Sequence, residues 1–322
     1  YKRQERRPPV GQEGLHALVR KREMLRSCSM TLRALLASAC VLALPLLSQS
    51  QTMELARVQA AHASLRQAQN QDDRLALHGQ LQSLWVEAAE AGQLMDVDWT
   101  SWNEAVVDLG DGPDRVVVYT WNVELDDRTQ RYGGWVARAA PDSELGYTWT
   151  ALSHDLEVDL LDNNRMHRHD RWQGGLYYDG VLTLDKNTPV YTLLAWDGAD
   201  GLTNRKWVET IDLRNGRVRF GSPRFELADG LRKRHVMAYA DAVQAVLRIE
   251  REPLRIIMDD LAPQDPAFQG QPAFYGPTLS YNALTWKNGR WHFQKNIAVA
   301  NPEDGQNREY RDPSLRRRPR NR

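Results

Sequence analysis

The spacing of apolar residues changes once along the chain, near residue 104. Before that point, apolar side chains recur every three or four positions among alanines and glutamines, at Leu55, Val58, Leu65, Leu77, Leu81, Leu84 and Trp85. This spacing predicts helix over 51–92. Polar residues 70–73 interrupt the run, so the pattern fits a helical hairpin or one long helix, with Asp72 or Asp73 capping a second helix and Gly92 ending it.

After residue 104 the apolar residues alternate with polar ones and are mostly β-branched or aromatic. This pattern predicts strands over 116–121, 132–138, 147–153, 175–184, 190–196, 207–213, 217–220, 235–239, 244–249, 254–258, 281–286 and 290–295. Asn215-Gly216 and Asn288-Gly289 each join two such runs and predict type I′ hairpin turns. Asp179-Gly180 fits a tight turn or a bulge inside one strand.

Short strands that follow one another without intervening helices predict a mainly β domain over 104–300. We expect an antiparallel meander preceded by the helical segment. A barrel, a sandwich and a small propeller-like arrangement all fit this pattern. The tryptophans on the predicted strands recur at irregular intervals, which gives no sign of a regular propeller repeat.

One continuous apolar run, Ala34–Leu47, follows Arg33 and precedes small residues ending at Ser50. This order is typical of a signal peptide over 24–50, and the run is shorter than the ~20 residues of a membrane-spanning helix. Residues 1–23 fit an untranslated or disordered upstream segment. Cys40 lies inside the apolar run instead of ending it, so the pattern favours a periplasmic or extracellular protein over a lipid-anchored one, with no transmembrane segment in the mature chain.

Charge and cysteine content narrow the classes of function. Cys28 and Cys40 both precede the predicted cleavage site, so the mature chain has no thiol for a disulfide or a cysteine nucleophile. Residues 51–307 carry 26 basic and 37 acidic side chains, a net charge of −11. An acidic body argues against nucleic acid as a partner. The arginine-rich end, 301–322, fits a disordered basic tail.

Two groups of residues have ligand types that metals use, although turn and loop interpretations are favoured for both. Asp108, Asp111 and Asp114 recur every third position in a glycine-containing stretch, which suits calcium as well as a turn. His167 and His169 would share one face of a strand, which suits zinc, but they follow a loop-like segment. We therefore favour no metal site, and calcium remains the cofactor to consider.

Aromatic and charged residues between 172 and 281 are the main candidates for a binding surface. Amphipathic rings supply a large contact area with a polar end, and neighbouring charges can hold a ligand, although any single ring is more often part of the core. The candidate binding residues are Trp172, Tyr177, Tyr178, Trp196, Asp197, Arg205, Lys206, Asp259, Tyr275 and Tyr281.

Several segments in a fixed order resemble a family of uncharacterised secreted bacterial proteins. They are residues 114–122, 172–178, 191–198, 204–206, 233–234, 258–263 and 271–281. The resemblance covers about 105–300 and implies export and a β-rich domain after a helical segment. It implies no activity.

Two functions from different classes fit these observations. The first is an exported β-rich binding protein of the bacterial envelope, whose ligand is a glycan, a peptide or an envelope protein. The alternative is a periplasmic hydrolase with an Asp-based or metal-assisted site near Asp197, Asp259 or His167. No nucleophile elbow, phosphate-binding glycine loop or zinc-protease helix is present in the sequence.

Overall fold

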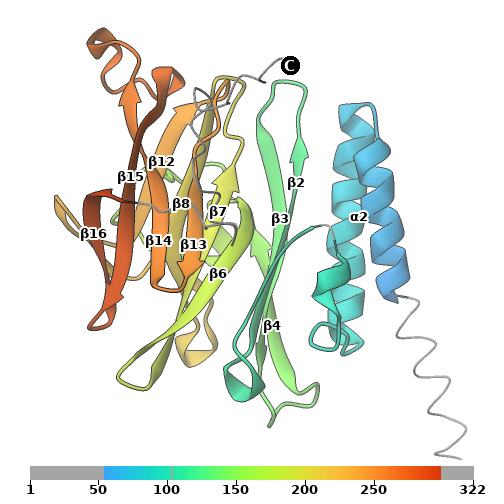
Figure 1. The fold of residues 1–322 in the computed structure, drawn as a ribbon. Coiled ribbons are helices and arrows are strands. Elements are labelled where there is room, and N and C mark those ends of the chain that lie inside the picture. The colour runs from blue at the N-terminus through green and yellow to red at the C-terminus, as the bar shows by residue number, and fades with distance from the viewer. Residues whose placement is uncertain (1–53, 103, 299–322) are drawn as a thin grey trace, which may run out of the picture. The chain divides into compact units, whose positions relative to one another are not determined.

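The computed structural model describes residues 54–102 and 104–298 (Figure 1). The predicted upstream segment, signal peptide and basic tail lie outside these residues, as do both cysteines. The described chain is mainly β with a helical pair at its start, as predicted. It divides into a helical unit, 54–68 with 79–93, and a β unit, 69–78 with 94–298, and the two are described separately.

The helical pair consists of a helix over 54–67 and helix α2 (Gln71–Glu90), which settles the alternatives in favour of a hairpin. Within the helical unit, the Arg57 side chain donates to Glu87 over 2.8 Å. The cap of the second helix lies two positions before Asp72, the earlier of the two aspartate caps that we predicted. Asn70 is its cap, since its side-chain oxygen accepts from the Asp73 N–H over 2.8 Å.

The β unit begins with an antiparallel sheet in the order β1-β2-β3-β4. Its strands are β1 (Ala105–Leu109), β2 (Val116–Glu124), β3 (Gln130–Ala139) and β4 (Tyr147–Ser153). The prediction that Asp108 lies in a loop is therefore wrong, because Asp108 lies in β1 and pairs with Val117 of β2. The sequence pattern missed this five-residue strand because it is too short to show a clear alternation.

A second sheet is built around β8 (Thr203–Asp212). It contains β5 (His167–Arg168), β6 (Leu176–Asp185), β7 (Thr188–Asp197), β9 (Arg219–Phe220) and β12 (Arg234–Ala240). The order is β5-β9-β8-β7-β6, and β12 pairs with β8 as well. The register of β6 against β7 shifts between Tyr177 and Asp179, so the ambiguity at Asp179-Gly180 resolves as a bulge within one strand.

The third sheet has the order β11-β10-β16-β15-β14-β13. Its strands are β10 (Phe225–Leu227), β11 (Gly230–Arg232), β13 (Leu247–Arg251), β14 (Leu254–Pro263), β15 (Tyr275–Lys287) and β16 (Arg290–Ile297). All its pairs are antiparallel except the short pair β10–β16. Asn288 and Gly289 form the two-residue turn between β15 and β16 with positive φ angles of 52° and 77°, as predicted.

Short 3₁₀ turns connect several of these strands. They are η1 (Trp99–Ser101), η2 (Gly112–Asp114), η3 (His169–Arg171), η4 (Arg214–Gly216), η5 (Pro266–Phe268) and η6 (Pro272–Phe274). Asn215 and Gly216 in η4 both have positive φ angles, and β8 and β9 pair on either side of it, so this predicted hairpin also forms.

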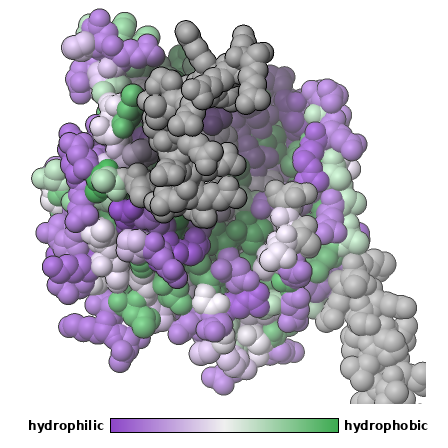
Figure 2. Space-filling view, viewed as in Figure 1, coloured by the Kyte–Doolittle hydropathy of each residue, from purple (hydrophilic) through white to green (hydrophobic). Residues whose placement is uncertain are grey.

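The three sheets pack face to face, with the sheet of β5–β9 and β12 in the middle (Figure 1). On β7, Leu193 and Ala195 belong to the core shared with the β1–β4 sheet, whereas Leu194 belongs to the core shared with the β13–β16 sheet. Of the three arrangements that the sequence left open, the observed one is a sandwich, here with three layers. Hydrophilic side chains cover most of the described surface on the face that Figure 2 shows.

The middle sheet contains a buried ion pair between Glu209 of β8 and Arg234 of β12. Both side chains are fully buried, and the Arg234 guanidinium donates twice to one Glu209 oxygen, over 2.9 and 3.1 Å. The other carboxylate oxygen accepts from Gln173, Tyr177 and Trp207 over 2.6–2.8 Å. These five hydrogen bonds replace the water that the carboxylate loses on burial.

Removing one partner of this pair should destabilise the fold strongly. In Arg234→Met the Glu209 charge stays buried without its cation, and we expect a loss of about 3–5 kcal/mol in the free energy of unfolding. A double variant, Arg234→Met with Glu209→Gln, removes the uncompensated charge and should recover part of this loss. Urea denaturation measures both changes. A single variant as stable as the wild type, or a double variant no better than the single one, would contradict this account.

Candidate functional site

A groove of about 740 Å³ opens at one end of the middle sheet. Three aromatic rings, Tyr178, Trp196 and Tyr239, line it together with the polar side chains of Asn204 and Lys206. We call it the aromatic groove. Its remaining lining residues are Ala105, Leu176, Asp241, Val243, Gln244, Ala245, Val246 and Leu247.

Strand register explains why these side chains meet. Trp196 of β7 pairs with Lys206 of β8, and Asn204 of β8 pairs with Tyr239 of β12. Paired residues on adjacent strands share a face, and residues two apart on one strand do so as well. These four side chains therefore lie on one face of the sheet. Tyr178 joins them from β6, where it is the extra residue of the bulge.

Three side chains hold the segment 241–247, which forms one wall of the aromatic groove. The Lys206 ammonium donates to the carbonyl of Ala245 over 2.6 Å, and the Tyr178 hydroxyl donates to the carbonyl of Leu247 over 2.8 Å. The Asp259 carboxylate accepts from the Val246 N–H over 2.6 Å. The wall is thereby fixed in place by residues of β6, β8 and β14, which favours a preformed site.

The polar groups of the groove are paired with one another. Burial lowers the pKa of Lys206, partly opposed by the Asp259 charge, and its ammonium lies 5.9 Å from the centre of the Tyr178 ring. Asp241 accepts from Asn204 over 2.8 Å and lies 3.6 Å from Arg128. Neither sign of charge is left in excess at this site.

Both tyrosine hydroxyls of the groove are kept neutral by their surroundings. Burial raises the pKa of Tyr239 to about 12, and a hydrogen bond from the Trp196 side chain opposes this rise. Burial also raises the pKa of Tyr178 well above its usual range. The two phenols therefore act as uncharged hydrogen-bonding groups over the physiological pH range.

The structure brings only some of the predicted binding residues together. Tyr178, Trp196 and Lys206 line the aromatic groove, and Asp259 lies behind its wall. The other predicted residues lie elsewhere: Trp172 and Tyr177 are fully buried in the core shared with the β1–β4 sheet, and Tyr275 and Tyr281 lie on β15 outside the groove lining.

Asp197 and Arg205 line a separate polar pocket of about 380 Å³. Asp197 accepts from the Tyr132 hydroxyl over 2.7 Å, from the Ala199 N–H over 3.0 Å and from Arg205 over 3.3 Å. His154 also lines this pocket, and its Nδ1 accepts from the Tyr132 N–H over 3.2 Å.

The weak metal candidates are not arranged as a ligand set. Asp108 is held by two hydrogen bonds from Arg115, and Asp111 and Asp114 lie next to and within η2. His167 is buried, and its Nδ1 lies 2.8 Å from the Gln173 side-chain oxygen, whereas His169 lies in η3. Across residues 54–102 and 104–298, no group of three or more His, Cys, Asp or Glu side chains gathers to hold a metal.

Tyr239, Asn204 and Asp241 complete the groove but were absent from the predicted binding residues. A usable signal existed for Tyr239, which lies two positions from the apolar Met237 in the predicted strand 235–239 and is buried with it on one face. Its pairing with Asn204, however, depends on β12 returning to the edge of β8, which the local pattern does not encode.

Comparisons with known proteins identify no relative of this chain. No family model, no curated protein and no solved structure matches the chain. The resemblance to secreted bacterial proteins therefore stays a prediction from the quoted segments. Among the described residues, no helix is long and apolar enough to span a membrane.

Histidines with a lowered pKa make stability depend on pH, and the half-buried His154 offers the clearest test. Burial and the nearby Arg131 charge lower the pKa of His154 to about 4. An unfolded histidine has a pKa near ~6.5, so between these values the unfolded state binds more protons, and stability falls as the pH falls from ~6.5 to ~4. Between pH 7 and 5, urea denaturation should show the wild type losing about 1–2 kcal/mol more than His154→Asn. An equal loss in the two proteins would contradict the assignment.

Proposed function

We propose that this protein binds a neutral glycan segment in the aromatic groove and holds it without chemical change. The observation that carries the proposal is the meeting of Tyr178, Trp196 and Tyr239 with Asn204 and Lys206 around one preformed hollow. Sugar rings present apolar faces and polar edges, and an aromatic site with a few polar side chains matches both.

The charge balance of the groove favours an uncharged ligand. Asp241 is paired with Asn204 and Arg128, and Lys206 is already bonded to a backbone carbonyl. Lys206 and Asp241 carry opposite charges in the same lining, so an ionic ligand would be attracted by one of them and repelled by the other. An uncharged sugar needs only hydrogen bonds, and Asp241 and Lys206 keep their own partners when it binds.

An exported location supports a glycan of the cell envelope as the ligand. The expectation of export comes from the signal-like residues 24–50, which lie outside the described residues. The same charge balance also suits a peptide, whose neutral backbone has similar hydrogen-bonding groups. We favour the glycan because three rings line a hollow of this size.

The hydrolase alternative has weaker support, because two of its three candidate centres have structural roles. Asp259 holds the groove wall, and His167 is buried against Gln173. Asp197 remains, in the polar pocket with His154, and its hydrogen bonds with Tyr132, Ala199 and Arg205 position its own loop and neighbours. The binding function therefore has the stronger support.

The test is calorimetric titration of the protein with neutral oligosaccharides of N-acetylglucosamine and of glucose. We expect Trp196→Ala to weaken binding at least about tenfold, because a central ring that loses its contacts typically costs more than ~1.4 kcal/mol. Tyr275→Ala is the matched control, since it removes a partly exposed ring outside the groove and should leave affinity unchanged.

Three outcomes would overturn the proposal. They are no binding of any neutral oligosaccharide, equal affinity in Trp196→Ala, or an equal loss in Tyr275→Ala. Shorter sugar products released by the wild type but not by Asp197→Asn would establish the hydrolase instead.

A further inference from the structure

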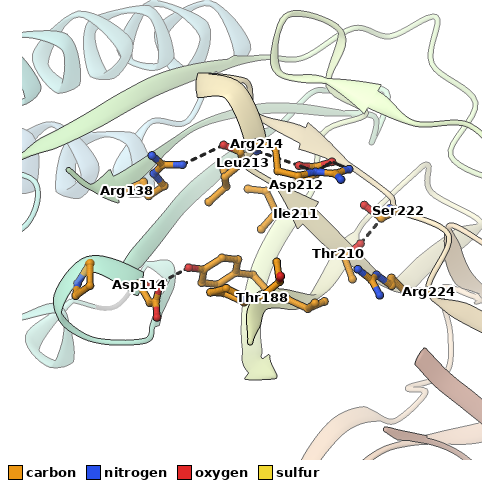
Figure 3. A pocket seen from close by; sticks show the side chains of 14 residues that line it. Asp114, Arg138, Thr188, Thr210, Ile211, Asp212, Leu213, Arg214, Ser222 and Arg224 are labelled. Atoms are coloured by element: carbon orange, nitrogen blue, oxygen red, sulfur yellow. Dashed lines mark hydrogen bonds and ion pairs between the residues drawn. The ribbon is translucent and has the colours of Figure 1, made fainter. Parts of the chain in front are cut away.

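A second pocket, of about 360 Å³, lies apart from the aromatic groove where η2 and β3 approach β7 and β8. Figure 3 shows Arg138 and Arg224 on opposite sides of it, with Thr188 and Ile211 between them. The other lining residues are Pro113, Asp114, Pro189, Val190, Tyr191, Thr210, Asp212, Leu213, Arg214 and Ser222.

Hydrogen-bond donors outnumber free acceptors in this pocket. Arg138 has a single bonded partner, the carbonyl of Leu213 at 3.1 Å, and no carboxylate lies within 4.0 Å of it among the described residues. Arg224 donates through one nitrogen to Asp185 and to the carbonyl of Gly289, over 2.5 and 2.8 Å, which leaves its other guanidinium nitrogens for a ligand.

The carboxylates near the pocket are already neutralised or screened. Asp212 accepts three hydrogen bonds from the Arg214 side chain, over 2.6–3.1 Å, and Asp185 is paired with Arg224. Asp114 is exposed to water, where its charge is screened. The hydroxyl groups of Thr188, Thr210 and Ser222 add further donors to the lining.

The pocket lining is basic although the body of the chain is acidic. It carries Arg138, Arg214 and Arg224 against Asp114 and Asp212, a net charge of +1, within a region 51–307 whose net charge is −11. Arg219 lies close enough to Asp212 for its charge to lower the pKa of that carboxyl. A local excess of positive charge raises the concentration of anions at the pocket.

We propose that this pocket binds a small organic anion through its phosphate or carboxylate group. The anionic oxygens would lie between Arg138 and Arg224, where charge-assisted hydrogen bonds are strongest. The apolar lining residues Val190, Ile211 and Leu213 would contact the organic part. The proposal is independent of the aromatic groove, whose ligand is neutral.

The test is titration of the full chain with phenyl phosphate, benzoate, inorganic phosphate and uncharged benzyl alcohol, followed by thermal shift and calorimetry. We expect both organic anions to bind, the alcohol not to bind, and inorganic phosphate to bind more weakly than phenyl phosphate because it lacks the apolar part. Arg138→Gln should weaken phenyl phosphate at least about tenfold, since it loses a charge-assisted bond.

Arg248→Gln is the matched control, because it removes one exposed positive charge from β13, away from the pocket. It should bind phenyl phosphate as the wild type does. Arg138 carries no buried ion pair, so its variant should keep the wild-type melting temperature to within a few degrees. No binding of either anion, equal affinity in Arg138→Gln, or an equal loss in Arg248→Gln would overturn the proposal.

Discussion

A carboxylate that is buried in a β-sheet must have all its hydrogen bonds supplied by the protein, and Glu209 imposes this constraint on the middle sheet. Its donors come from β6, β8, β12 and the segment before β6. Because Arg234 must reach Glu209, β12 is held opposite β8 with Arg234 and Glu209 paired in register. Five residues further along, the same register sets Tyr239 opposite Asn204. The aromatic groove thus depends on a core interaction that contacts no ligand.

The same sheet serves two pockets of opposite character. At one end, charges are paired among the groove residues and three rings line the hollow. At the second pocket, Arg138 of β3 and Arg224, which precedes β10, leave donors without acceptors beside apolar side chains of β7 and β8. A protein that met a neutral glycan and a small anion together could use both sites without either ligand competing for the other's contacts.

The strands were largely predictable because their alternation is local. Each predicted run overlaps an observed strand, although some bounds differ by several residues, and Asn288-Gly289 forms the turn expected of it. The short strands β1, β5, β10 and β11 were not predicted, since two to five residues show no clear period. The stacking of three sheets and the return of β12 to β8 depend on contacts between distant residues, which a local pattern does not contain.

At the site, residue types alone distinguished aromatic from charged candidates. They did not show which candidates lie at the surface and which lie in the core. Trp172 and Tyr177 were as plausible as Tyr178 and Trp196 until the bulge in β6 and the alternation along β7 determined which ring faces which layer.

Glycan binding at Trp196 is tested most directly by a heteronuclear NMR titration of the tryptophan indole N–H signals with a neutral oligosaccharide. We expect the Trp196 signal to shift with ligand concentration while the signals of the buried Trp172 and Trp207 stay in place. Shifts confined to other tryptophans, or none at saturating sugar, would contradict it.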